Sequence, residues 1–260
     1  MKQRVITAVI ALAALLPVLF AAPPTVTLLI VAALLLAGSW EWSAFLKVGQ
    51  PAVRFAYVVL LAVLFAAAAA KLDVLGTPIL FVGLAWWVGA LVWAFFYPTP
   101  VPAAVAWAGG IAVMVPLFVA LATLLQASPQ VVLFMLLIVW IADSGALFAG
   151  KSFGRVKLAP AISPGKTWEG VVGGLAAVTL LALAVGLYGN LNLAALLPFC
   201  LACACLSVVG DLTVSMFKRD VGIKDSGTLF PGHGGVLDRI DSIAAAGPLF
   251  AIGIGWIGAQ

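Results

Sequence analysis

Long hydrophobic runs separated by short polar clusters organise the whole chain. Between charges, prolines and polar clusters there are nine such runs, each near the roughly 20 apolar residues that a membrane-spanning helix needs. The runs cover residues 5–22, 25–46, 55–70, 74–97, 103–125, 131–148, 171–187, 193–217 and 236–256. The first run has the flanks of a signal peptide, but it is too long for one and no soluble domain follows it, so we expect a retained span. The pattern predicts an all-α, polytopic membrane helical bundle with about nine transmembrane helices.

Composition supports this prediction and excludes other classes. Of 260 residues, 65% are hydrophobic and 8% are charged, whereas soluble domains carry about a quarter charged residues. The sparse charge also argues against a disordered chain or a coiled coil, and the 26 glycines show no three-residue collagen period. We therefore expect an integral membrane protein.

The basic residues indicate an orientation. The chain has 13 Lys and Arg against 9 Asp and Glu, an excess that in a membrane protein indicates cytoplasmic segments and anionic headgroups, not nucleic acid. If the N-terminus is cytoplasmic, the inner segments hold basic residues near 2–4, 47–54, 151–166 and 218–224, while the outer connections hold only Lys71. The positive-inside rule thus predicts a cytoplasmic N-terminus and, after nine crossings, an outer C-terminus.

Charge is also concentrated late in the chain. No charged residue lies between Asp73 and Asp143, whereas nine lie from Asp211 to Asp241. We therefore divide the chain into an N-terminal transmembrane scaffold of about five spans, residues 1–130, and a C-terminal catalytic transmembrane region of about four spans, residues 131–260. The second region would carry cytoplasmic loops at 149–170 and 218–235.

Two familiar patterns do not carry function here. Cys200, Cys203 and Cys205 lie in an apolar run without a second cluster or a nearby histidine, so we interpret them as small hydrophobic residues. Residues 145–152 fit the Walker A pattern, but they follow a membrane span instead of a strand in a soluble nucleotide-binding domain. Neither pattern is interpreted as a site.

The eighth run ends with polar residues at helical spacing. Asp211, Ser215, Lys218 and Arg219 stand at i, i+4, i+7 and i+8, which places them on one face of a helix. A carboxylate at membrane depth normally faces a polar cavity or a partner. The alternative to a functional site is an internal ion pair that only locks helices together.

A glycine-rich segment precedes the last run. Gly234 and Gly235 allow backbone N–H groups to converge on an anion at a helix N-terminus. His233 is the single histidine, and it either binds a ligand or hydrogen-bonds within the loop. Asp238 and Asp241 either complement the helix dipole or face Asp211, where the three acids would form an oxygen-rich site for Mg²⁺.

A second polar group precedes the seventh run. Asp143 and Ser144 end the sixth run, and Lys166 follows Ser163, Pro164 and Gly165 before the seventh. Lysine beside hydroxyl groups suits phosphate, and the intervening Lys151, Arg155 and Lys157 suit phosphate or anionic lipid equally. Acids for a divalent cation, several basic residues and a glycine-rich segment together indicate phosphoryl or nucleotidyl transfer, where positioning and charge neutralisation dominate.

The stretch from Ser215 to Asp241 closely resembles the signature of the phosphatidate cytidylyltransferase (CDP-diacylglycerol synthase) family. That signature runs S-x-x-K-R-x4-K-D and then H-G-G-x-x-D-R-x-D, and this chain shows no departure from it. Residues 142–145, 153–154 and 163–170 resemble the family's upstream pattern. The resemblance covers the C-terminal half in detail.

The resemblance implies an enzyme that transfers CMP from CTP to phosphatidic acid, giving CDP-diacylglycerol and pyrophosphate for phospholipid biosynthesis. It implies a Mg²⁺ requirement, and it allows a K⁺ ion beside Mg²⁺ in a dinuclear centre. The implied metal carboxylates are Asp211 and Asp238, with Asp241 beside them. The implied catalytic residues are Asp211, Asp238, Lys218, Arg219 and Lys224. The implied substrate-binding residues are Lys166, Ser215, His233, Gly234, Gly235, Arg239, Asp143 and Ser144.

The expected partners are CTP, phosphatidic acid from the inner leaflet and membrane lipids. No nucleic acid is expected, and a homodimer is left open. The expected location is a bacterial plasma (inner) membrane, crossed many times.

Three other functions are weighed. A CTP-dependent lipid-alcohol kinase would release CDP instead of pyrophosphate. A secondary transporter would use Asp143, Asp211 and Asp238 as an ion relay, but transporters usually have two matching halves, and here the first half is neutral and the second charged. A CDP-alcohol phosphotransferase is disfavoured because its D-G-x-x-A-R…G-x-x-x-D-x-x-x-D pattern is missing.

Overall fold

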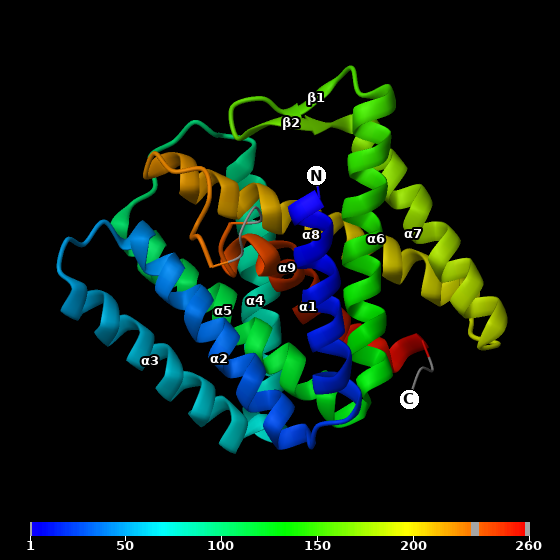
Figure 1. Cartoon of the computed structure of the whole chain (residues 1–260), viewed down its shortest axis with the longest axis horizontal. Coiled ribbons are helices and arrows are strands. Elements are labelled where there is room, and N and C mark those ends of the chain that lie inside the picture. Colours follow the sequence, from blue (N-terminus) through cyan, green and yellow to red (C-terminus); the bar gives the residue numbers. More distant parts are fainter. Residues whose placement is uncertain (1, 230–233, 258–260) are drawn as a thin grey trace.

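The chain folds into an almost wholly helical bundle (Figure 1). The structure is a computed structural model that describes residues 2–229 and 234–257. Within these residues the helices are α1 (Lys2–Phe20), α2 (Pro24–Trp42), α3 (Pro51–Ala70), α4 (Leu72–Ala94), α5 (Ala103–Ala127), α6 (Pro129–Phe153), α7 (Trp168–Tyr188), α8 (Leu193–Asp220) and α9 (Leu237–Gly253). Two 3₁₀ turns, η1 (Ser43–Leu46) and η2 (Ile254–Ile257), and a hairpin of β1 (Lys157–Ala159) and β2 (Ser163–Thr167) complete the described elements.

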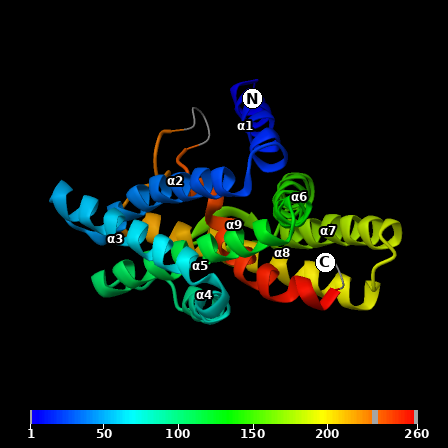
Figure 2. The same cartoon turned by 90° about the horizontal axis from the view of Figure 1, so that it is seen from below.

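Each of the nine predicted apolar runs coincides with one of these helices, so the all-α membrane bundle is confirmed. Seven helices, α2 to α8, are long and apolar enough to cross a membrane. Helix α9 has 17 residues, shorter than the roughly 20 that a perpendicular span needs. Figure 2 shows α1 standing apart from the flattened stack of the other helices, and α1 contacts α2. The count of nine crossings and the side of the N-terminus stay predictions.

Both predicted loops begin a few residues later in the structure than the sequence pattern placed them. Helix α6 continues through Phe153, where Lys151 in the last turn complements the negative end of the helix dipole. Helix α8 continues to Asp220 for the same reason, with two basic residues in its last turn. The predicted loop 149–170 is therefore a shorter connection, 154–167, that contains the antiparallel β hairpin at the top of Figure 1.

Side chains at the base of the hairpin fix where α7 begins. The Thr167 hydroxyl accepts a hydrogen bond from the N–H of Gly170 at 3.1 Å, as an N-cap does. The Glu169 carboxylate accepts the N–H of Val156, at 3.1 Å to one oxygen and 3.2 Å to the other. These contacts hold the hairpin across the ends of α6 and α7.

Glycines let α6 and α7 pack closely. A Cβ added to Gly174 would lie 2.6 Å from the carbonyl oxygen of Ala142, and one added to Gly145 would lie 2.9 Å from Cβ of Ala177. Small residues at such an interface are typical of membrane helices, whose association depends on van der Waals packing. The interface holds α6, and with it Asp143, against the helix that follows the hairpin.

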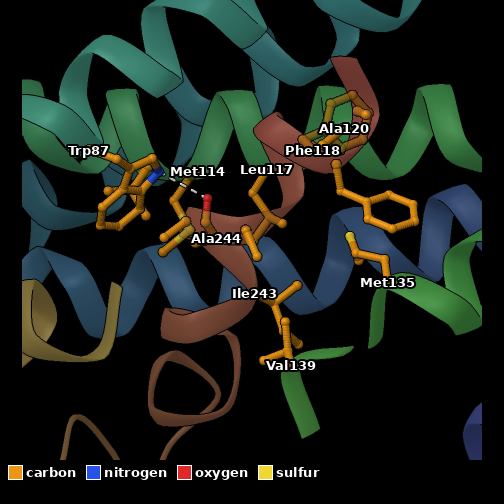
Figure 3. Packing of buried hydrophobic residues seen from close by; sticks show 14 of the residues in the cluster. Trp87, Met114, Leu117, Phe118, Ala120, Met135, Val139, Ile243 and Ala244 are labelled. Atoms are coloured by element: carbon orange, nitrogen blue, oxygen red, sulfur yellow. Dashed lines mark hydrogen bonds between the residues drawn. The ribbon is translucent and has the colours of Figure 1, made fainter. Parts of the chain in front are cut away.

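Helix α9 is buried in the centre of the bundle, among α4, α5 and α6 (Figure 3). Pro248 interrupts its backbone hydrogen bonds, because proline lacks the N–H that would bond to the carbonyl of Ala244. The indole N–H of Trp87, on α4, donates to this carbonyl at 3.0 Å. A polar group that would otherwise lie unpaired in the membrane interior is thereby satisfied.

The predicted inner connections meet at one end of the bundle. The Lys47 ammonium lies 2.7 Å from the Asp220 carboxylate and donates to the carbonyl of Val101 at 3.0 Å. The Arg219 guanidinium donates to the carbonyl of Ile162, in the hairpin, at 3.2 Å. Residues from three predicted inner segments, together with Val101, therefore contact one another, which shows that these segments share one end of the bundle.

Candidate active site

The hairpin brings Lys166 to the middle of α8. Its ammonium Nζ lies 2.7 Å from Oδ2 of Asp211, and the hydroxyl of Ser215, one turn later, donates to Oδ1 of Asp211 at 3.2 Å. The Asp211 side chain is 34% exposed, so this pair lies at an accessible surface. The polar residues before the seventh apolar run and those at the end of the eighth, which are separate in the sequence, therefore form one site.

Three helices contribute a carboxylate beside Lys166. The charge of Asp211, on α8, acts on both Asp143, on α6, and Asp241, on α9. Asp143 is exposed, whereas Asp241 is buried and its Oδ1 accepts the N–H of Ser242 at 2.8 Å. Helices α8 and α9 approach closely here because residue 210 is a glycine, at which a Cβ would collide with the Asp241 carbonyl.

Asp238 pairs with Lys218. Its Oδ1 accepts a hydrogen bond from the Lys218 ammonium at 2.8 Å, and both side chains are under 10% exposed. Its Oδ2 accepts the N–H groups of Ser226 at 2.9 Å and Gly235 at 3.0 Å. The charge of Asp211 acts on Asp241, whereas Asp238 is engaged by Lys218 and two backbone N–H groups and ties the loop before α9 to α8.

The glycine-rich segment already holds anions of the protein itself. The N–H of Gly235 binds Asp238, and the N–H groups of Val236 and Leu237 bind the carboxylate of Glu41 at 2.9 and 2.8 Å. The pattern was interpreted as an anion-binding segment, and in this structure carboxylates of the protein itself take these donors. Sequence reasoning missed Glu41, although it is the only acid before Asp73 and lies near the end of an apolar run.

The remaining predicted residues are distributed around these groups. The Arg219 guanidinium donates hydrogen bonds to the carbonyls of Ile162 and Ile223. Its role in the site stays a prediction. Arg239 is exposed and its charge acts on Asp143. Of the other predicted site residues, Ser144 and Lys224 are exposed. Gly234 is half-buried and has a φ of +81°. His233 lies outside the described residues.

The Walker A-like stretch and the cysteine cluster keep the interpretation drawn from the sequence, as patterns without a site. Residues 145–152 lie inside α6 and form no phosphate-binding loop. Cys200 and Cys203 are buried among apolar side chains of the core, as expected of small hydrophobic residues.

The donor set at Asp211 suits a hard cation in its chemistry. It offers carboxylate oxygens from three helices and the Ser215 hydroxyl, and hard divalent cations prefer such ligands. In residues 2–229 and 234–257, no three acidic, histidine or cysteine side chains are already arranged as a metal cage. The Lys166 ammonium balances the Asp211 charge in this structure, and both oxygens of Asp238 are engaged.

Comparison with known proteins gives a consistent family. The pattern of the cytidylyltransferase family matches residues 2–256. The chain is 43% identical to the phosphatidate cytidylyltransferase of Pseudomonas aeruginosa over 96% of both chains. It is 36% identical to the phosphatidate cytidylyltransferase of Haemophilus influenzae over 96% of this chain and 97% of that one. A protein of the same name from Staphylococcus aureus is 46% identical over 46% of this chain. The chain belongs to the cytidylyltransferase family.

Proposed function

We propose that this protein transfers CMP from CTP to phosphatidic acid, giving CDP-diacylglycerol and pyrophosphate. The observation that carries the proposal is the alternation of positive and negative side chains where the hairpin, α8 and α9 meet. Lys166 pairs with Asp211, Asp241 lies beside Asp211, and Lys218 pairs with Asp238. The full-length similarity to two proteins named phosphatidate cytidylyltransferase supports the same reaction.

In this reaction an oxygen of the phosphatidate headgroup attacks the α-phosphorus of CTP. The bond from that phosphorus to the bridging oxygen of the β-phosphate breaks, and pyrophosphate leaves with the bond's electron pair. A phosphomonoester is largely dianionic at pH 7, so the nucleophile needs no strong base. Lys166 and Lys218 would exchange their carboxylate partners for phosphate oxygens, and thereby orient the two anionic substrates and offset their repulsion.

The proposal includes Mg²⁺, held by Asp211 with Asp241 and Asp143 beside it. The bound cation would supply charge neutralisation for the phosphates. Asp238 would join this group only by releasing Lys218, because its oxygens are engaged by Lys218 and two backbone N–H groups. A K⁺ ion in the same centre stays a prediction from the resemblance.

We place the site at the cytoplasmic face of a bacterial inner membrane. The connections that contain Lys47, Lys166 and Arg219 lie on one side of the bundle, and the positive-inside rule assigns such a side to the cytoplasm. CTP would reach the site from the cytoplasm and phosphatidic acid from the inner leaflet. Assembly as a homodimer stays a prediction.

The test is product analysis of the purified protein in lipid nanodiscs with CTP labelled at the α-phosphate, phosphatidic acid and Mg²⁺. Label should enter the lipid with an equal amount of pyrophosphate, and Asp211→Asn should abolish the transfer. Asp73→Asn, in the first turn of α4, is the matched control and should keep full activity. Label released as CDP, with phosphorylation of an added lipid alcohol, would instead establish a kinase.

A further inference from the structure

The carboxylate of Glu41 joins the first half of the chain to the second. Glu41 lies near the end of α2, and its Oε2 accepts the Ser226 hydroxyl at 2.8 Å and the N–H of Leu237 at 2.8 Å. Its Oε1 accepts the N–H of Val236 at 2.9 Å. These partners lie 185 to 196 residues away in the sequence, so neither the signature nor local spacing could indicate the contact.

Glu41 acts as the missing N-cap of α9. The first N–H groups of a helix have no partner within the helix. The residue at the cap position, Val236, has helical backbone angles and no side-chain hydrogen bond to offer. A carboxylate there accepts charge-assisted hydrogen bonds and complements the positive end of the helix dipole. Helix α9 therefore takes its cap from α2.

Two glycines make room for this carboxylate. A Cβ at Gly227 or at Gly235 would collide with the carboxylate oxygens of Glu41. Residues 226–227 and 235–237, on either side of residues 230–233, therefore surround the Glu41 carboxylate. The contact thus fixes the described parts of the loop on both sides.

The same loop holds the Lys218–Asp238 pair. Ser226 contacts Glu41 through its hydroxyl and Asp238 through its backbone N–H. Gly235, next to Val236 in the chain, donates its N–H to the second oxygen of Asp238. A shift of Ser226 or Gly235 would therefore move the Asp238 carboxylate and break its ion pair with Lys218.

We infer that Glu41 is a positioning residue for nucleotidyl transfer. Its carboxylate sets the loop and the first turn of α9 so that Asp238 and Lys218 keep their places, without touching substrate itself. The inference rests on the proposed function for its link to catalysis. The N-terminal scaffold then contributes a residue to the geometry of the active site.

The first test compares Glu41→Gln with Glu41→Asp in steady-state synthesis of CDP-diacylglycerol. Glutamine keeps the shape, but its NH₂ group would face N–H donors, so at least one of the three hydrogen bonds is lost. We expect kcat to fall at least tenfold while the KM for CTP changes less than threefold, because the binding groups stay present but are misplaced. Aspartate keeps the charge and both oxygens, and should recover part of kcat.

Glycine variants separate position from charge. Gly227→Ala should reproduce the loss of kcat in Glu41→Gln, because its Cβ displaces the same carboxylate. Gly49→Ala is the matched control, since a Cβ at this loop glycine meets no atom within 4 Å, and it should keep wild-type kcat. Wild-type kcat in either Glu41→Gln or Gly227→Ala would overturn the inference.

A second readout does not depend on the reaction. Amide hydrogen exchange, measured without substrate, should rise at least tenfold in residues 222–229 and 234–238 of Glu41→Gln and stay unchanged in α5. Unchanged exchange in the loop would overturn the inference, and so would a rise that extends equally to α5, because Glu41 would then support the fold in general. If the wild type makes no CDP-diacylglycerol, the proposed function fails while exchange still tests the positioning contact.

Discussion

The buried pair of Lys218 and Asp238 allows a quantitative prediction. Both side chains are under 10% exposed and their charged atoms lie 2.8 Å apart. Removing one partner of such a pair leaves an uncompensated buried charge, which typically costs about 3–5 kcal/mol of stability. Asp238→Asn would leave the Lys218 ammonium unpaired. Lys218→Met would leave a carboxylate that keeps two backbone N–H donors, so its cost should fall at the lower end of that range.

The double variant Lys218→Met with Asp238→Asn distinguishes the pair from two separate effects. It contains neither charge, so its loss of stability should be smaller than the sum of the single losses by at least about 2 kcal/mol, within the range found for coupled neighbours. We would measure unfolding of the purified protein in mixed micelles by tryptophan fluorescence, and extrapolate linearly in denaturant. Single costs that add to within about 0.5 kcal/mol would refute the reasoning, because independent sites behave in that way.

Activity should not follow stability in this series. The double variant regains stability, but it lacks both groups that the proposed reaction uses, so synthesis of CDP-diacylglycerol should stay abolished. A stable double variant with substantial activity would show that Lys218 and Asp238 serve the fold alone.

The remaining predictions concern packing, surface charge, the set-aside motif and the cation. Gly174→Val should cost about 1–3 kcal/mol by overpacking the interface of α6 and α7, seen as a lower thermal midpoint, whereas Gly89→Val, with open space around it, should lower the midpoint by less than half as much. Lys47→Met should cost less than about 1 kcal/mol, because the Lys47 side chain in its pair with Asp220 is 42% exposed, and a larger drop in the midpoint would contradict this. Lys151→Ala should keep wild-type kcat, because residues 145–152 form a helix and no nucleotide-binding loop; a tenfold loss of kcat would contradict this. Chelation by EDTA should abolish lipid labelling and added Mg²⁺ should restore it, and full activity in EDTA would refute the proposed cation.

The helices were predictable because the membrane imposes a simple rule on the sequence. A span must be apolar over its whole length, so each run between polar clusters identified one helix. The rule fails where a helix extends into the polar region, as α6 does through Lys151 to Phe153. It also gave no signal for the hairpin, whose strands have three and five residues and include Pro164 and Gly165.

The site was predictable only where its residues are close in sequence or share the signature. Asp211 and Ser215 are one helical turn apart, and their hydrogen bond follows from that spacing. The partner of Asp238 was not predictable, since the choice between Lys218 and the acid group depends on how α9 sits against α8. The role of Glu41 could not be predicted from the sequence, because an isolated acid near the end of an apolar run gives no indication of a partner almost 200 residues later.

The bond from Trp87 to Ala244 has a consequence for the orientation of α9 about its own axis. Apolar packing around α9 is not directional, and neighbouring residues of an α-helix are separated by about 100° around its axis. Pro248 leaves the carbonyl of Ala244 without a partner inside α9, and the indole N–H of Trp87, on α4, binds this carbonyl. The hydrogen bond therefore forms in only one rotation of α9 about its axis. A turn of one residue would break this bond and swing Asp241 away from Asp211. Pro248 and Trp87, although remote from the site, thus fix the rotation of α9 about its axis and with it the side on which the acidic residues of α9 lie.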